Sequence, residues 1–253
     1  MSKSCQTPWV RVLAYDYTAG YSVPLHHHEE HQLIYAKRGI MAVSTSGGTW
    51  IVPPQRAVWV PRRQKHSIEM SGRVEMRTLY FNSRAVFLDC RVVEVSPLLR
   101  ELILHIVERE GLSRTSRLDR SRLALLNSEL RAASTPGVYL PHPDDPRLRE
   151  VTARLRQRPD KHRDHRYLSG GTGVSLRTLQ RLCVRETGMP FGQYARQVRL
   201  MRSLELLALG RSVTAVGLDC GYESTSAFIS TFRRRFGVTP GRYFGAFAPA
   251  PPR

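Results

Sequence analysis

Histidines gather near the start of the chain, and their spacing suits metal or ligand binding. The segment PLHHHEEHQLIYAKRG (24–39) contains His26 and His28, which point to one face of a strand because side chains alternate along it. His66, in the later segment PPQRAVWVPRRQKHSIEM (53–70), joins them if the two strands are neighbours. Three imidazoles suit Zn, Fe, Ni or Cu. The cluster therefore predicts a divalent-metal site, or alternatively a polar ligand pocket or hydrogen-bonded core histidines.

Basic residues in the C-terminal part are the second chemical signal. The 253-residue chain has 39 Lys and Arg against 21 Asp and Glu, a net charge of +18, and +11 of this charge lies in residues 141–253. Such a surplus favours an anionic partner, because a basic surface attracts phosphates. We expect this partner to be nucleic acid, and an Arg-rich genome is the alternative explanation.

An internal repeat organises these basic residues. VSLRTLQRLCVRETGM (174–189) aligns with ESTSAFISTFRRRFGV (223–238) at an offset of 49 residues. In both copies a Ser is the expected helix N-cap, apolar residues form one stripe, and a Gly supplies the left-handed C-cap. A shorter helix ending in Gly is expected before each copy, at 168–173 and 212–221. Each unit therefore has the pattern of a helix-turn-helix.

The stretch between the two units, 190–209, is a strong helix former. At about 1.5 Å per residue it spans about 30 Å, close to the roughly 34 Å of one turn of B-DNA. One chain is therefore expected to place two recognition helices in successive major grooves. Gly170 and Gly171 are expected inside the first short helix, where each costs about 0.8–1 kcal/mol relative to Ala and loosens the first unit.

The apolar stripe of each repeat leaves polar side chains facing outward. In the first copy these are Arg177, Gln180, Arg181 and Arg185. In the second copy they are Thr225, Ser226, Ser230, Arg233 and Arg234. Arg bridges guanine and Gln bridges adenine, whereas short hydroxyls discriminate less between bases. The two arginines of the second copy lie at its helix end, where they are expected to contact phosphate or helix carbonyls. The alternative is ordinary exposure on surface helices.

The segment SVTAVGLDCGYESTSAFISTFRRRFGVTPGRYF (212–244) resembles the signature of the AraC/XylS family of bacterial transcription regulators, including the Gly-x-Thr-Pro and aromatic ending. LSGGTGVSLRTLQRLCVRETGMPFGQY (168–194) resembles the first helix-turn-helix of that family. The resemblance covers about residues 147–244. It implies binding to double-stranded promoter DNA with Arg177, Gln180 and Arg181 at base-contacting positions, and RNA polymerase as a further candidate partner.

The two histidine segments resemble the motifs of a cupin barrel, which many regulators of this family use to sense an effector. The resemblance implies a small-molecule effector in the barrel, near His26, His28, Gln32, Trp50 and His66. Gln32 stands where metal-binding cupins place Glu, and Arg63 replaces the Gly of their P-x-G-x-x-H turn.

These sites require a β-domain followed by helices. Up to residue 82, short β-branched and aromatic segments broken by Gly and Pro predict a sandwich or barrel. Helical periodicity follows, with Ser96 as N-cap, a second helix at 116–133, a turn-rich linker at 134–146 and helices from 147 onward. The expected fold class is α+β with two domains, a cupin-like β-barrel followed by helices and an all-α domain with two helix-turn-helix units joined by a long helix. The expected divisions are a sensor domain at 1–82, linking or dimerisation helices at 83–140 and a DNA-binding domain at 141–253.

The whole chain is expected to be a sequence-specific transcriptional regulator that responds to a small molecule. No segment reaches the roughly 18 apolar residues of a membrane span, which predicts a cytoplasmic protein without a membrane partner. The four cysteines lie far apart and are expected to be reduced thiols. A homodimer is expected, with the helix at 116–133 as its candidate surface. A metal-dependent cupin enzyme is the alternative, and it is disfavoured because no further carboxylate is placed for acid–base chemistry.

Overall fold

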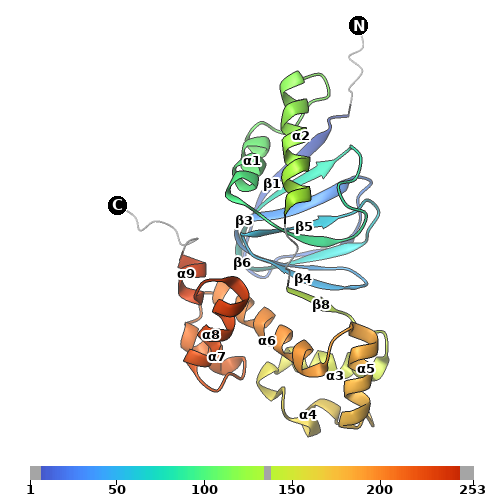
Figure 1. Cartoon of the computed structure of the whole chain (residues 1–253), viewed down its shortest axis with the longest axis vertical. Coiled ribbons are helices and arrows are strands. Elements are labelled where there is room, and N and C mark those ends of the chain that lie inside the picture. The colour runs from blue at the N-terminus through green and yellow to red at the C-terminus, as the bar shows by residue number, and fades with distance from the viewer. Residues whose placement is uncertain (1–6, 134–137, 246–253) are drawn as a thin grey trace. The chain divides into compact units, whose positions relative to one another are not determined.

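The computed structural model describes residues 7–133 and 138–245 of the chain. These residues form two compact units (Figure 1). Within the described range, the first unit holds residues 7–46 and 50–133, and the second holds 47–49 and 138–245. No helix in these ranges is both long and apolar enough to cross a membrane. Cys90, Cys183 and Cys220 are free thiols, and Cys5 lies outside the described residues.

Seven strands, of which only the first two residues of β4 fall in the second unit, build the first unit and pair antiparallel wherever their register is assigned. They are β1 (Val10–Tyr17), β2 (Ser22–His26), β3 (His31–Ser44), β4 (Gly48–Val52), β5 (Arg56–Val60), β6 (His66–Phe81) and β7 (Arg91–Glu94). The long strands β3 and β6 pair with each other, β1 and β2 pair with β6, and β5 pairs with β3 and β7. Along β6, buried residues alternate with more exposed ones over most of its length, as expected for a strand with one face on a core.

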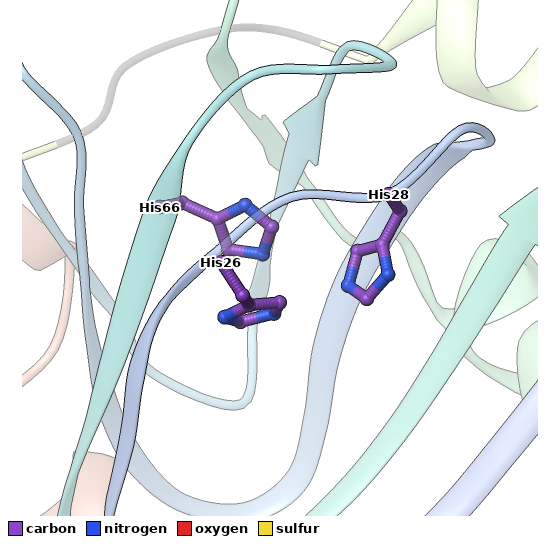
Figure 2. A group of neighbouring side chains, drawn as sticks. All are labelled: His26, His28 and His66. Atoms are coloured by element: carbon purple, nitrogen blue, oxygen red, sulfur yellow. The ribbon is translucent and has the colours of Figure 1, made fainter.

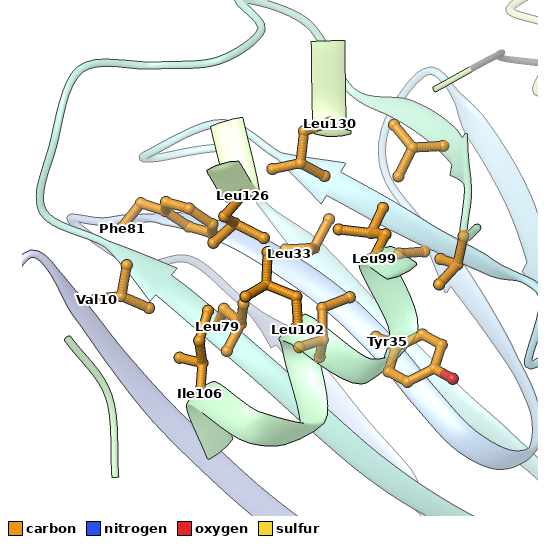
Figure 3. Packing of buried hydrophobic residues seen from close by; sticks show 14 of the residues in the cluster. Val10, Leu33, Tyr35, Leu79, Phe81, Leu99, Leu102, Ile106, Leu126 and Leu130 are labelled. Carbon is orange, nitrogen blue, oxygen red and sulfur yellow. The ribbon is translucent and has the colours of Figure 1, made fainter. Parts of the chain in front are cut away.

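Two helices close one end of this sheet, α1 (Pro97–Glu108) and α2 (Arg117–Ala132). Ser96 caps α1 and Ser116 caps α2, each accepting a backbone N–H from three residues further on. Leu102 of α1 and Leu126 of α2 belong to one buried cluster with Leu33 and Phe81 of the strands (Figure 3). The two helices therefore extend the core of the barrel.

Strand β7 corrects the expectation that residues beyond Asn82 are helical. It lies at Arg91–Glu94 and pairs with β5 in the register Val58↔Val92, so the sheet continues past the expected end of the β-domain. A second strand, β8 (Val138–Pro141), lies in the stretch expected to be a linker. It belongs to the second unit, where the Tyr139 hydroxyl donates to the carbonyl of Gly47 at 2.7 Å.

The second unit is helical from residue 146 onward. Its elements are α3 (Pro146–Gln157), the 3₁₀ turn η1 (Pro159–Lys161), α4 (His165–Ser169), α5 (Leu176–Thr187), α6 (Phe191–Ala208), α7 (Val213–Asp219), α8 (Thr225–Phe236) and α9 (Pro240–Gly245). The two halves of the repeat are α5 and α8, and α6 connects their units. At about 1.5 Å per residue, the 18 residues of α6 span about 27 Å.

The repeat is confirmed in its local details. Ser175 and Ser224 cap α5 and α8 with a hydrogen bond from the third residue of each helix. Gly188 and Gly237 end them in the left-handed region, with φ of 71° and 79°. A methyl group on Gly217 of α7 would lie 3.3 Å from Cβ of Phe228, so this glycine permits the close crossing of α7 and α8.

The expected position of Gly170 and Gly171 inside a helix is wrong. Helix α4 already ends at Ser169, Gly170 is its C-cap with extended ψ of 127°, and Gly171 has a left-handed φ of 76°. The first short helix therefore lies about three residues earlier than the sequence pattern indicates. The two glycines form the turn between the helices, where the helix-interior penalty of glycine does not apply.

Candidate functional site

Three imidazoles meet in the first unit (Figure 2). His26 is the last residue of β2 and pairs across the sheet with His66, the first residue of β6. His28 lies in the loop after β2, which corrects the expectation that it shares a strand with His26. The ring centroids are 4.3 Å apart for His26 and His66, 4.8 Å for His26 and His28, and 5.5 Å for His28 and His66. One nitrogen from each ring lies within 4.8 Å of the other two.

Backbone carbonyls orient two of these rings. Nδ1 of His26 lies 2.7 Å from the carbonyl of Pro24, and Nδ1 of His66 lies 3.0 Å from that of Gln64. A neutral ring that donates from Nδ1 presents a lone pair at Nε2, the arrangement that metal-binding histidines use. Nε2 of His28 and Nε2 of His66 are buried and have no hydrogen-bond partner among the described residues. The cluster thus offers inward lone pairs, which fits a divalent metal or a hydrogen-bond donor of a ligand.

Burial favours the neutral form of two of these imidazoles, His66 and His28. It lowers the pKa of His66 to about 4, with the neighbouring imidazoles His26 and His28 adding to the effect. Burial also lowers the pKa of His28, and the charge of His26 contributes. Neutral imidazole is the form that binds a metal ion, so the lowered pKa values of His28 and His66 favour metal binding by these two rings.

Gln32 lies beside this cluster on β3. Its amide Nε2 donates to Thr78 Oγ1 and to the Tyr80 hydroxyl, both at 3.2 Å, and its Oε1 is buried without a described partner. Tyr80 connects Gln32 to His28, because its ring meets the imidazole edge-on at a centroid distance of 4.9 Å. Tyr80 was not predicted from the sequence. Trp50 is a buried residue of β4, and its contact with a ligand stays a prediction.

The loop before β6 is tied to the loop that carries His28. Arg63 donates its backbone N–H to the carbonyl of His28 at 2.7 Å, and its guanidinium pairs with Glu29 at 3.0 Å. Arg63 adopts a left-handed φ of 61°, a conformation that glycine adopts without steric cost and that other residues adopt rarely. At the position where the P-x-G-x-x-H turn has Gly, this chain therefore has an Arg in a conformation that favours glycine.

Helix α5 presents the side chains expected to contact bases. Arg177, Gln180 and Arg181 are exposed and have no hydrogen bond or ion pair with any described residue. Leu179, Leu182 and Cys183 are buried behind them. Arg185 differs from these residues, because it pairs with Glu186 at 2.7 Å and with Asp145 at 3.7 Å. Its charge is therefore already engaged within the unit.

Helix α8 presents shorter side chains and then a basic end. Ser226 and Ser230 are exposed, and with Arg233 and Arg234 they line one shallow surface groove. Thr225 is half-buried, as the first residue of the helix. Four of the five expected contact residues of the second helix-turn-helix thus lie along one groove, and Thr225 is not among its lining residues.

Further basic residues lie between α5 and α6 and were missed from the sequence. His162, Arg163, His165, Arg196 and Arg199 line a groove of about 650 Å³ together with Gln180. The spacing of Arg196 and Arg199, three residues apart on a helix, was the signal that could have indicated a shared face.

Comparisons with known proteins agree with the two units. The family model of the AraC-like ligand binding domain matches residues 9–128, and a helix-turn-helix domain model matches residues 168–246. The HTH-type transcriptional regulator NimR of Escherichia coli (strain K12) is 33% identical over 232 residues, covering 91% of this chain and 85% of that protein. The HTH-type transcriptional activator RhaR of Pectobacterium atrosepticum is 24% identical over 254 residues, covering 87% of this chain and 85% of that protein.

Among solved structures, ToxT from Vibrio cholerae aligns with a TM-score of 0.40 and 11% identity, covering 95% of this chain and 99% of that chain. An AraC-type DNA-binding regulator from Chromobacterium violaceum aligns with a TM-score of 0.36 and 30% identity, covering 41% of this chain and 93% of that chain. The assignment rests on the sequence matches, which extend over both units. The chain therefore belongs to the AraC family of transcriptional regulators, with an AraC-like ligand-binding domain followed by a helix-turn-helix DNA-binding domain.

Proposed function

We propose that this regulator recognises its promoter through the exposed faces of α5 and α8. The observation that carries the proposal is the exposed trio Arg177, Gln180 and Arg181, which has no partner in the described part of the chain and stands on a helix capped at both ends. Ser226 and Ser230 on α8 offer hydroxyls at the matching positions of the second helix-turn-helix. The first helix-turn-helix, through α5, then supplies most of the base discrimination, because bidentate Arg and Gln contacts distinguish bases better than hydroxyls do.

Selection from a random duplex pool tests this division. Arg181→Ala and Gln180→Ala should each relax the preference at a defined base by about 1–3 kcal/mol, whereas Arg234→Ala should weaken binding to all sequences alike. Arg185→Ala is the matched control on α5, because that guanidinium is held by Glu186 and Asp145. Equal specificity profiles for Arg181→Ala, Gln180→Ala and Arg234→Ala would show that the helix faces are assigned wrongly.

The effector site that the geometry supports best is the three-histidine cluster of the first unit. Its support is the pair of buried Nε2 atoms, on His28 and His66, which have no partner among the described residues and are suited to bind a ligand donor or a metal. Zn, Fe, Ni or Cu fits the three imidazoles, and such an ion would supply positive charge for binding an effector group. The chain's residues then hold the ion and orient the rings through Pro24 and Gln64.

Chelation combined with substitution separates the metal and metal-free alternatives. If a metal is bound, chelation abolishes induction and His28→Ala has the same effect. If the pocket is metal-free, chelation has no effect and His28→Ala only weakens the ligand. A coupling of about 1–3 kcal/mol would change DNA affinity about 5- to 150-fold. His27→Ala is the control, because this exposed imidazole is not part of the cluster. Unchanged induction in folded variants at His26, His28 and His66 would exclude the cluster.

A homodimer is proposed as the active form, with a corrected surface. Leu126 and Leu130 of α2 are buried in the protein's own core, which leaves Leu118 and Leu125 as the exposed leucines of this helix at 59% and 42%. Sedimentation velocity of a Leu118→Glu and Leu125→Glu double variant tests it, and an unchanged mass would place the dimer contact elsewhere. RNA polymerase is proposed as a partner at the promoter, and in vitro transcription tests this. The cytoplasm is proposed as the location of the protein.

The enzyme alternative has less support. The relatives named above are transcription regulators. Glu29 and Glu30, which follow His28 in the sequence, form ion pairs with Arg63 and Arg11 at 3.0 and 3.2 Å. Both carboxylates are thus engaged by arginines, Glu29 at the surface and Glu30 half-buried.

A further inference from the structure

The groove between α5 and α6 is strongly basic. Arg163, Arg196 and Arg199 line it together with two imidazoles, and no carboxylate is among its lining residues. Glu223 reaches Arg163 from outside this lining at 2.8 Å, but both side chains are more than three-quarters exposed, so the pair neutralises little of the charge. The apolar side of the groove comes from Leu176, Val184 and Phe191. A site of this composition favours an anion.

Arg199 is the half-buried cation of this groove, and all its partners are neutral. Its guanidinium donates to the carbonyls of Cys220 and Gly221 at 2.7 and 2.8 Å and lies 4.1 Å from the centre of the Tyr222 ring. On its other side Nη1 lies 3.2 Å from Nε2 of His162. These contacts fix the charge in place without compensating it.

The position of the groove identifies the anion. Arg199 contacts the segment before the first helix-turn-helix through His162, and the turn of the second through Cys220 and Gly221. Gln180, a proposed base-contacting residue, lines the same groove. The groove therefore lies next to the proposed DNA-contacting face of α5, and Arg199 connects it to the turn of the second helix-turn-helix. A duplex contacted by both helix-turn-helices exposes its phosphodiester backbone between the two contacted segments.

We propose that this groove binds a phosphate of the DNA backbone, from the part of the duplex that lies between the segments contacted by α5 and α8. The proposal rests on the proposed DNA contact of these two helices. Arg199 supplies a fixed charge, and Arg196, which is exposed and has no partner among the described residues, supplies a mobile one. Contacts of this kind set the register of the protein on the duplex and carry no base preference.

Arg196→Gln tests the proposal without disturbing the fold, because the native side chain is exposed and unpaired. The probe is a duplex selected from a random pool by the wild-type protein. The slope of log affinity against log salt should become less steep by about 0.9, and affinity at 0.1 M salt should fall about eightfold, with base preference unchanged. Arg131→Gln is the matched control, because Arg131 is an exposed arginine on α2 in the first unit. This variant should keep the wild-type slope.

Neutral methylphosphonates, placed singly along the duplex, locate the contact. At one central phosphate the wild-type protein should lose at least about eightfold in affinity, and Arg196→Gln should lose less there, because only the Arg199 contact is left to remove. Additive losses at every central phosphate would overturn the proposal. So would an unchanged salt slope combined with stabilisation of the wild type, but not of Arg196→Gln, by inorganic phosphate, since the groove would then be a small-anion site. Unaltered base preference in Arg181→Ala would instead refute the proposed DNA contact of α5.

Discussion

Substituting His66 tests whether the histidine cluster is a buried, neutral site. His66 has no exposed surface, and burial lowers its pKa from 6.5 to about 4. Between these two pH values the unfolded chain binds a proton on this imidazole and the folded chain does not, so the free energy of unfolding falls as pH falls. The loss is absent above pH 6.5 and reaches about 3 kcal/mol at pH 4, at about 1.4 kcal/mol per pH unit.

Urea denaturation followed by tryptophan fluorescence measures this loss in the first unit, because Trp9, Trp50 and Trp59 all lie there. His66→Asn keeps a donor for the carbonyl of Gln64 but cannot be protonated, so from pH 7 to pH 4 it should lose about 3 kcal/mol less than the wild type. His27→Asn, which removes an exposed imidazole next to the cluster, should follow the wild type. Parallel curves for His66→Asn and the wild type would refute the neutral, buried state.

Three further predictions concern the elements that hold the two sites. Gly188→Ala and Gly237→Ala should each destabilise the second unit by about 1–2 kcal/mol, because both residues have left-handed φ although open space surrounds them; an unchanged melting temperature would contradict this. Leu126→Ala should cost about 2–5 kcal/mol and Leu118→Ala less than about 1 kcal/mol in tryptophan-detected unfolding, since only Leu126 is buried; equal effects would mean that α2 does not cover the barrel. A fragment of residues 138–253 should bind promoter DNA in a salt-sensitive manner. A fragment of residues 147–253 should also bind, but its free energy of unfolding should be about 1 kcal/mol lower because it lacks the Asp145 cap of α3. A folded fragment without DNA affinity would refute the assignment of DNA binding to this part of the chain.

The second unit was predictable from the sequence because its signals are local. A Ser cap, two apolar residues and a Gly end lie within fourteen positions in each half of the repeat, and each has the predicted role in α5 and α8. The beginning of α1 was predictable for the same reason, from Ser96 and Pro97. The outward residues of α5 follow directly, because the helical period fixes which side chains oppose Leu179 and Cys183.

The first unit was less predictable because its contacts are distant in sequence. The four residues of β7 carry too short a pattern to distinguish a strand, and only pairing with β5 defines it. The histidine cluster depends on the register that places His26 opposite His66, and on the contacts of Arg63 with His28 and Glu29, which hold the loop that carries His28. Residue types predicted the cluster, whereas its tautomers, its burial and the neighbouring Tyr80 required coordinates.

The corrected position of α4 changes the expected balance between the two helix-turn-helix units. With Gly170 and Gly171 placed inside a helix, the first helix-turn-helix was expected to be less stable than the second. In the structure Gly171 provides the left-handed turn, and Arg154 of α3 donates to the carbonyls of Tyr167 and Gly170 at the end of α4. This guanidinium satisfies carbonyls that a helix end otherwise leaves unpaired. The turn of the first helix-turn-helix is therefore fixed by hydrogen bonds. This helix-turn-helix carries the Arg and Gln side chains best suited to distinguish bases, and precise bidentate contacts require such a fixed support.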